Sequence, residues 1–288
     1  MSLAIRIIPK LDIKGPNLVK GVHLEGLRVL GRPEEFAKYY YENGADELIY
    51  QDVVASLFGR NSLKDMISRT AKEIFIPFTV GGGIRNIDDI YNILHSGADK
   101  VSINTSAILN SNLISSASSI FGTSTIVISI DAIKQPDGKY YAFTDNGRNS
   151  TGREVIEWAK EVEQLGAGEI VLTCVDQEGS GKGFDLFLAS EVADSVSIPI
   201  VVHGGAGTSQ HVFNLAEKSS ISGVAISSLF HYDYILHNRD LTGHPKEGNK
   251  DFLKSNRVPS NIQSISISNL KSYLLERNIN CRKYEKDL

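Results

Sequence analysis

Two aspartates stand at matching places in the chain, each at the end of a short run of β-branched residues. Asp12 ends the run AIRIIPKLD, Asp131 ends the run TIVISID, and a lysine follows each within three residues. Two carboxylates on opposite sides of one site can act as general acid and general base on a group between them. Either aspartate alone could instead cap the next loop, so it is their matched placement that favours catalysis.

Glycines end two other runs, IPFTVGGG and IPIVVHGGAG, and small polar residues end the runs that follow them. Backbone without side chains lets N–H groups approach an anion, and a following helix N-terminus adds a favourable dipole. One such turn could be only a tight strand-to-helix connection. Two at matched places predict two phosphate sites, and therefore a ligand with a phosphate at each end. The residues concerned are Gly81, Gly82, Gly83, Asn104 and Thr105, then Gly204, Gly205, Gly207, Ser227 and Ser228.

These residues belong to eight short β-branched runs that alternate with longer amphipathic stretches. This alternation is typical of βαβ units and a parallel sheet. Eight parallel strands predict a closed (β/α)8 TIM barrel, whose active site forms at the carboxyl ends of the strands. The eight runs cover residues 4–12, 47–53, 76–82, 100–104, 125–131, 169–176, 198–205 and 223–228.

The runs also repeat at a nearly constant offset. Pro77 and Pro199 are 122 positions apart, and Asp12 and Asp131 are 119 apart. Any βα units share valine, isoleucine and glycine, but this general likeness does not predict a shared offset for acids, prolines and glycine pairs. The repetition therefore predicts two fused half-barrels.

The predicted layout is one domain over residues 1–288. The half-barrels cover about 1–122 and 123–236, and a polar stretch at about 237–260 predicts an inserted loop. A closing helix is expected at about 266–278, with Ser268 as its N-cap.

Composition excludes several functional classes. The net charge of -4, with both signs interspersed, gives no basic field for nucleic acid. No stretch approaches the roughly 18 apolar residues of a membrane span, and no signal peptide is recognisable. Cys174 and Cys281 are interpreted as reduced thiols of a cytoplasmic protein. The seven histidines show no ligand spacing, so neither a metal nor a cofactor is predicted.

Four charged residues stand at or near the starts of predicted strands: Arg6, Glu47, Lys100 and Glu169. Charge at such positions is costly unless it is paired. Alternating signs could close a salt-bridged ring across the barrel floor, although composition alone favours four solvated ends.

The sequence resembles the cyclase subunit of imidazole glycerol phosphate synthase, the HisF family, over about residues 4–234 and again at the last helix. The motifs that carry the likeness are RIIPKLDIKG, DELIYQD, FTVGGGIR, GADKVSINT, VISIDA, GAGEIVLT, GGAG and SSLFH. The neighbouring phosphoribosyl isomerase family, HisA, shares the half-barrel ancestry, but DELIYQD and ADKVSINTSA favour the cyclase.

The resemblance implies an enzyme that uses ammonia on a ribulosyl-linked aminoimidazole carboxamide ribonucleotide carrying two phosphates. The products are imidazole glycerol phosphate and the carboxamide ribonucleotide, in histidine biosynthesis. Asp12 and Asp131 match the acid–base pair of the family. Because the chain carries no Cys-His-Glu glutaminase, a separate HisH-like glutaminase is the implied partner.

The resemblance also assigns the remaining site residues. The matched substrate and phosphate positions are Lys20, Gly83, Asn104, Thr105, Asp176, Gly179, Ser180, Gly205, Gly207, Ser227 and Ser228. The matched ammonia gate is Arg6, Glu47, Lys100 and Glu169, which replaces the interpretation of solvated ends.

Several residues depart from the family pattern. Lys10 stands where cysteine is usual, Glu178 stands where aspartate is usual, and His203 replaces a small residue. The first loop reads KGPN rather than KDGR. Two alternatives therefore stay open. One is a HisF-like paralogue of surface-polysaccharide biosynthesis that passes ammonia to a sugar. The other is a phosphate-binding scaffold for a glutaminase, against which the two retained aspartates argue.

Overall fold

The computed structural model describes residues 4–55, 63–238 and 259–284. Eight parallel strands close into a barrel, because the last strand of the path pairs back to the first. Their order around the barrel is β1 (Arg6–Lys14), β4 (Leu48–Asp52), β5 (Phe78–Gly81), β6 (Lys100–Ile103), β7 (Ile126–Lys134), β10 (Glu169–Cys174), β11 (Ile200–His203) and β12 (Gly223–Ile226). All eight predicted runs form these strands, so the predicted (β/α)8 barrel is confirmed.

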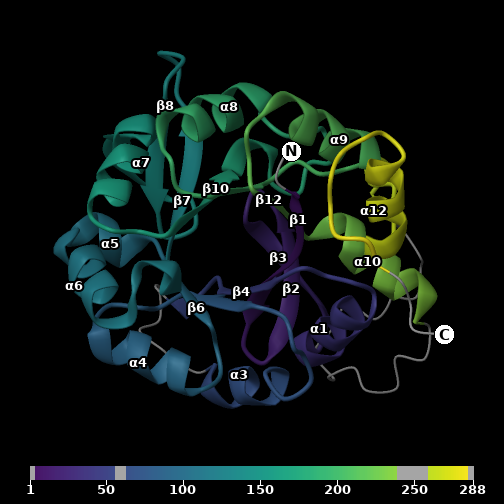
Figure 1. Cartoon of the computed structure of the whole chain (residues 1–288), viewed down its shortest axis with the longest axis horizontal. Coiled ribbons are helices and arrows are strands. Elements are labelled where there is room, and N and C mark those ends of the chain that lie inside the picture. Colours follow the sequence, from purple (N-terminus) through teal and green to yellow (C-terminus); the bar gives the residue numbers. More distant parts are fainter. Residues whose placement is uncertain (1–3, 56–62, 239–258, 285–288) are drawn as a thin grey trace.

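Helices surround the barrel as an outer ring (Figure 1). Several begin at the residue types that their sequences lead one to expect, since the side chains of Asn86, Asp185 and Thr208 each accept a hydrogen bond from the first helical turn. The helices are α1 (Pro33–Glu42), α3 (Lys64–Thr70), α4 (Ile87–His95), α5 (Thr105–Leu109), α6 (Asn112–Phe121), α7 (Val155–Gln164), α8 (Leu186–Ser195), α9 (Ser209–Lys218), α10 (Ser228–His237) and α12 (Ile267–Leu275), with 3-10 turns η1 (Thr123–Thr125) and η2 (Val175–Gln177).

The barrel interior is layered because alternate residues of a strand point to the same side of the sheet. On β1, Arg6 lies at the floor, Ile8 in the middle, and Lys10 and Asp12 toward the mouth. The middle layer is a separate apolar cluster of Ile8, Ile49, Val127, Val171, Val201 and Ala225. A larger apolar core packs the outer face of the strands against the helices. One strand therefore contributes to the floor, the core and the mouth.

Two hairpins extend the barrel strands in a way that the sequence did not predict. Strands β2 (Asn17–Val22) and β3 (Glu25–Gly31) follow β1, whereas β8 (Tyr140–Thr144) and β9 (Asn149–Glu154) follow β7. The hairpins occupy equivalent places after the first and the fifth barrel strand. Each brings one residue, Leu24 or Asn146, to the cavity at the barrel mouth.

At two positions of the barrel mouth, glycine is required for purely steric reasons. Gly82 has φ 101° and Gly205 has φ 116°, a region that favours glycine. A Cβ on Gly205 would lie 2.0 Å from the carbonyl oxygen of Gly183, and a Cβ on Gly82 would lie 2.4 Å from that of Asp52. These turns therefore require glycine whether or not an anion binds there.

The C-terminal part corrects one detail of the sequence analysis. Helix α12 begins after Ser266, whose side chain accepts a hydrogen bond from the backbone N–H of Asn269. Ser268 is therefore not the N-cap, because it already lies inside the helix while Ser266 has the extended backbone of a cap. Most of the predicted insertion, residues 239–258, lies outside the described residues. Within the described residues, no helix combines the length and apolarity needed to cross a membrane.

Candidate active site

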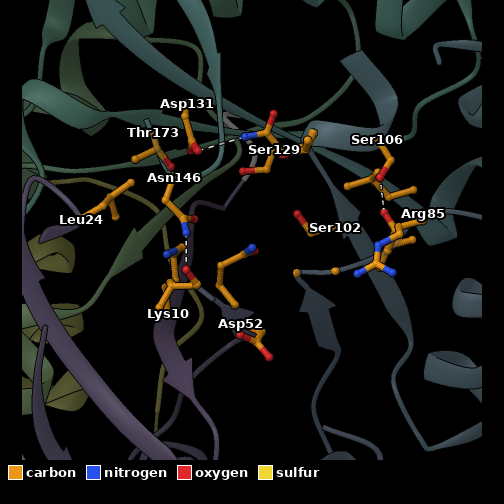
Figure 2. Close-up of a pocket in the computed structure, with 18 of the residues that line it drawn as sticks. Lys10, Leu24, Asp52, Arg85, Ser102, Ser106, Ser129, Asp131, Asn146 and Thr173 are labelled. Atoms are coloured by element: carbon orange, nitrogen blue, oxygen red, sulfur yellow. Dashed lines mark hydrogen bonds between the residues drawn. The ribbon is translucent and has the colours of Figure 1, made fainter. Parts of the chain in front are cut away.

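A cavity of about 240 Å³ opens at the carboxyl ends of the strands. Side chains from several strands surround it (Figure 2). Asp131 faces the cavity, and so do Gly83, Asn104 and Thr105, which form the first predicted phosphate site. The structure thus brings one predicted carboxylate and one predicted phosphate site together.

Asp131 is buried, with 7% of its surface exposed. The side-chain amide of Asn104 donates a hydrogen bond of 3.0 Å to Oδ2 of Asp131. Burial raises the pKa of Asp131 to about 6, against the opposing effect of the nearby Lys10 ammonium. A carboxyl group with such a pKa can both donate and accept a proton near neutral pH.

Asp12 is 1% exposed and is not among the residues that line this cavity. Lys10, which does line it, places its Nζ 2.5 Å from Oδ1 of Asp12. Burial acts to raise the pKa of Asp12, but the cations of Lys10 and Lys20 outweigh it and hold that pKa below its usual value. The two predicted catalytic carboxylates therefore differ in protonation behaviour.

The second predicted phosphate site forms a separate cavity of about 10 Å³. Gly179, Gly205, Ser227 and Ser228 line it, together with Glu178 and His203. The hydroxyl of Ser227 is already used, since it donates to the carbonyl oxygen of Lys10 at 2.7 Å. A Cβ on Gly207 would lie 2.1 Å from the carbonyl oxygen of Gly181, so the backbone itself closes over that position. This second site is much tighter than the first.

A buried ion pair lies beside the second site. The Nζ of Lys20 is bonded to Oε1 of Glu178, and Oε2 of Glu178 accepts a hydrogen bond of 3.0 Å from the backbone N–H of Leu24. The backbone N–H of His23 donates to the carbonyl oxygen of Glu178 at 2.9 Å. Glu178 therefore ties the β2–β3 hairpin to the second phosphate site.

His203 lies next to this pair, with Nε2 4.0 Å from Glu178 Oε1. Burial and the charge of Lys10 lower the pKa of His203 to about 4, so the ring is neutral at physiological pH. Its Nδ1 lies 3.1 Å from the carbonyl oxygen of Ala225, and its buried Nε2 has no hydrogen-bond partner. The sequence singled out His203 as the one histidine that could face substrate and marked Lys10 and Glu178 as departures from a pattern, and the structure places all three in the site.

Four predicted substrate-binding residues line neither cavity: Lys20, Asp176, Ser180 and Gly207. Asp176 is exposed, and its Oδ2 accepts a hydrogen bond from the backbone N–H of Lys134 at 2.9 Å. The hydroxyl of Ser180 donates to the carbonyl oxygen of Gln177 at 2.8 Å. In this structure the side chains of Asp176 and Ser180 stabilise loops. Among the described residues, no three His, Cys, Asp or Glu side chains gather in a way that could hold a metal ion.

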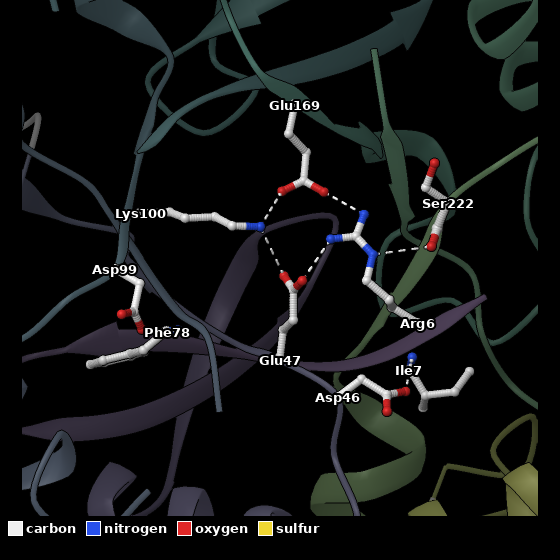
Figure 3. A network of polar contacts seen from close by, with 9 residues as sticks. All are labelled: Arg6, Ile7, Asp46, Glu47, Phe78, Asp99, Lys100, Glu169 and Ser222. Atoms are coloured by element: carbon white, nitrogen blue, oxygen red, sulfur yellow. Dashed lines mark hydrogen bonds and ion pairs between the residues drawn. The ribbon is translucent and has the colours of Figure 1, made fainter. Parts of the chain in front are cut away.

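The four charged residues at the opposite end form a closed ring (Figure 3). Arg6 bonds to Glu47 at 2.7 Å and also to Glu169. Lys100 lies 3.3 Å from Glu47 and 2.9 Å from Glu169. The interpretation of four solvated ends is wrong, because β1, β4, β6 and β10 begin at the same level and bring opposite charges together.

These features define a (β/α)8 barrel with paired carboxylates and glycine turns at its mouth and a charged ring at its floor. The model of the histidine biosynthesis protein family matches residues 6–235. The chain belongs to this family, among its imidazole glycerol phosphate synthase HisF members.

Several relatives of the chain are HisF subunits of imidazole glycerol phosphate synthase. The chain is 56% identical over 203 residues to the imidazole glycerol phosphate synthase subunit HisF of Legionella pneumophila, covering 70% of this chain and 96% of that protein. It is 44% identical over 230 residues to the HisF subunit of Bacillus cereus strain ATCC 10987, covering 80% of this chain and 91% of that protein. The HisF subunit of Streptococcus sanguinis is 43% identical with the same coverage. These names favour the histidine-pathway enzyme over the sugar-modifying alternative.

Proposed function

We propose that this chain is the cyclase subunit of an imidazole glycerol phosphate synthase. It uses ammonia to convert a bis-phosphorylated ribulosyl-aminoimidazole carboxamide ribonucleotide into imidazole glycerol phosphate and aminoimidazole carboxamide ribonucleotide. The observation that carries the proposal is the pair of buried carboxylates, Asp12 and Asp131, at the mouth of a HisF-family barrel. The unpaired thiols of Cys174 and Cys281 suit a cytoplasmic enzyme.

The two carboxylates act as the acid–base pair of the reaction. Asp131 faces the main cavity and titrates near neutral pH, where proton transfer is most effective. Asp12 is bonded to the ammonium of Lys10, which separates it from the main cavity. It acts on the same central group of the substrate. Because Asp131 faces the cavity and Asp12 contacts a lysine, the two carboxylates are suited to different roles in proton transfer.

Each phosphate of the substrate has its own cradle. Gly83, Asn104 and Thr105 hold one phosphate in the main cavity. Gly205, Gly207, Ser227 and Ser228 hold the other, with Gly179 and Ser180 from the adjoining loop and Lys20 from β2. Asp176 contacts another part of the substrate. Because the second cavity has a volume of only about 10 Å³, the β2–β3 hairpin moves when the substrate spans both cradles.

Ammonia enters from the floor, where a HisH-like glutaminase docks. The ring of Arg6, Glu47, Lys100 and Glu169 is the entry gate. Above it lies the apolar layer around Ile8, which a neutral ammonia molecule crosses at lower cost than an ammonium ion. The two ends of the barrel thus serve the two reactants.

The test is turnover of the histidine-pathway intermediate by the purified chain with an ammonium salt. The wild-type protein should release both products, and Asp12→Asn and Asp131→Asn should each lower kcat by at least about 100-fold. Thr151→Ala, on the β9 strand away from both cavities, is the matched control and should retain turnover. Phosphate binding without turnover in the wild-type protein would contradict the proposal.

The gate is tested by comparing two ammonia sources. Lys100→Met should change turnover that is driven by the glutaminase and glutamine. It should change turnover that is driven by ammonium salt to a smaller extent. An equal effect on both would mean that the ring only stabilises the barrel.

A further inference from the structure

Lys10 occupies an unusual position for a charged side chain. It is 5% exposed, it lies on β1 toward the barrel mouth, and it lines the main cavity. Its Nζ lies 2.5 Å from Oδ1 of Asp12, two residues further along the same strand. Residues two apart on a strand share a face, so the pair is built into the geometry of β1.

The titratable groups that act on Asp12 come from its own strand, β1, and from two further elements. Lys20 on β2 and His203 on β11 act on it together with Lys10. His203 has no hydrogen bond to Asp12, and Lys20 is bonded to Glu178. Lys10 is therefore the cation that contacts Asp12 directly.

Asp131 has a different set of neighbours. It is bonded to the neutral amide of Asn104, and the charges of Lys10, Asp12 and Glu178 act on it from β1 and from the loop after β10. The two carboxylates thus share Lys10 as a neighbour, but only Asp12 is in contact with it. Two nearby carboxylates in unequal fields ionise at different pH values.

We propose that Lys10 is a positioning residue that keeps Asp12 ionised, so that Asp12 accepts a proton in the reaction while Asp131 donates one. The proposal rests on the cyclase function proposed above and assigns a direction to its acid–base pair. Without the ammonium of Lys10, Asp12 takes up a proton from the solvent at low pH. A protonated Asp12 can no longer accept a proton from the substrate, so the base of the reaction is lost. Lys10 itself needs no contact with the reacting atoms.

The experiment is the pH profile of kcat/KM for the wild-type protein, Lys10→Met and Lys10→Arg, with free ammonia held constant at each pH. In Lys10→Met, the acidic limb should move to higher pH by about 1 to 3 units, which is the usual effect of an adjacent cation on a carboxyl group. Lys10→Arg keeps the charge and should keep the wild-type limb. An unmoved limb in Lys10→Met would overturn the proposal.

A second buried lysine supplies the matched control. Lys271 is 1% exposed and lies 2.6 Å from Asp46, remote from both cavities. Lys271→Met should lower stability without moving the acidic limb. An equal movement of the limb in Lys271→Met would show a general effect of destabilisation and would overturn the assignment to Lys10.

A titration separates this inference from the cyclase function. In the wild-type protein with ¹³C-labelled aspartate carboxyl groups, the signal assigned by Asp12→Asn should titrate below the ordinary aspartate range. A signal that titrates within or above that range refutes the inference whether or not the enzyme turns over. Absence of turnover together with a low Asp12 pKa refutes the cyclase function and leaves the role of Lys10 in holding the charge of Asp12 standing.

Discussion

The side-chain amide of Asn104 donates a hydrogen bond of 3.0 Å to Oδ2 of Asp131 and a second of 3.2 Å to the carbonyl oxygen of Phe143. Asn104 follows β6, Asp131 lies on β7, and Phe143 lies on the β8 strand of the second hairpin. One amide therefore joins the predicted phosphate site to the predicted acid. Because an N–H donor favours the ionised carboxylate, the bond opposes the burial that raises the pKa of Asp131.

Asn104→Ala should raise the pKa of Asp131 further above 6. A neutral hydrogen bond contributes about 1 kcal/mol, so the alkaline limb of the kcat profile should move up by about half a pH unit to one unit. The profile is measured at saturating substrate, since loss of a phosphate contact also raises KM. Thr105→Ala, whose hydroxyl is bonded to the backbone of Asp145 instead, should raise KM and leave the limb in place. A limb that moves down would contradict the prediction.

Asp131→Asn should stabilise the protein while it abolishes turnover. The pKa of Asp131 is about 6 in the folded chain and near 4 in the unfolded chain. Between pH 4 and pH 6, Asp131 is protonated in the folded chain and ionised in the unfolded chain. The free energy of unfolding therefore falls as the pH rises from 4 to 6, and it stays at the lower value above pH 6. The difference corresponds to about 3 kcal/mol, and asparagine removes this cost.

Urea unfolding at pH 8 and at pH 4 measures this effect. The variant should be more stable than the wild-type protein at pH 8, by up to about 3 kcal/mol, and the gain should vanish at pH 4. The same gain at both pH values would show that the substitution acts through packing and not through the charge.

The sequence predicted the barrel but not the hairpins, for a physical reason. Barrel strands are buried on both faces and appear as continuous β-branched runs. The β2–β3 turn instead places His23 and Leu24 at φ 52° and 60°, residue types that give no turn signal. Leu24 is held there by its N–H bond to Glu178, which lies far along the chain. The β8–β9 turn does carry a signal, Asn146 followed by Gly147, that could have revealed it.

In the candidate site, too, some features could be predicted from the sequence and others depend on the fold. Strand-end residues such as Asp131 and Asn104 follow from the strand boundaries alone. The pairing of Lys20 with Glu178, 158 positions away, depends on how β1 and β10 sit around the barrel. The closed ring at the floor depends on register too, so composition favoured solvated ends, and only the resemblance indicated otherwise.

The floor ring, which we propose as the ammonia gate, should also stabilise the barrel. The side chain of Arg6 bonds to both Glu47 and Glu169, whose side chains are 9% and 7% exposed. Arg6→Gln leaves two buried carboxylates with one cation between them, and loss of one partner of a buried pair typically costs about 3 to 5 kcal/mol. We expect the lower half of this range, because the Arg6 side chain is itself 24% exposed. Denaturant unfolding at neutral pH measures the loss.

An exposed ion pair provides the control for Arg6→Gln. Lys38 lies 3.0 Å from Glu73 with about half of each side chain exposed. Lys38→Gln should have little effect on stability, since solvent screens such pairs. Equal losses in the two variants would mean that the ring has no more structural weight than a surface contact.

Glu178→Gln should release the β2–β3 hairpin. Glu178 is 1% exposed in its side chain and accepts bonds from Lys20 and from the N–H of Leu24. The substitution leaves the buried ammonium of Lys20 without its counter-charge, and the hairpin can relieve this cost by opening to water. If the lost pair contributes about 3 kcal/mol to closure, the amides of residues 17–31 should exchange about 100-fold faster with deuterium. Glu25→Gln, an exposed carboxylate on the same hairpin, should leave exchange unchanged. Unchanged protection in Glu178→Gln would mean that backbone pairing with β1, rather than the ion pair, holds the hairpin over the site.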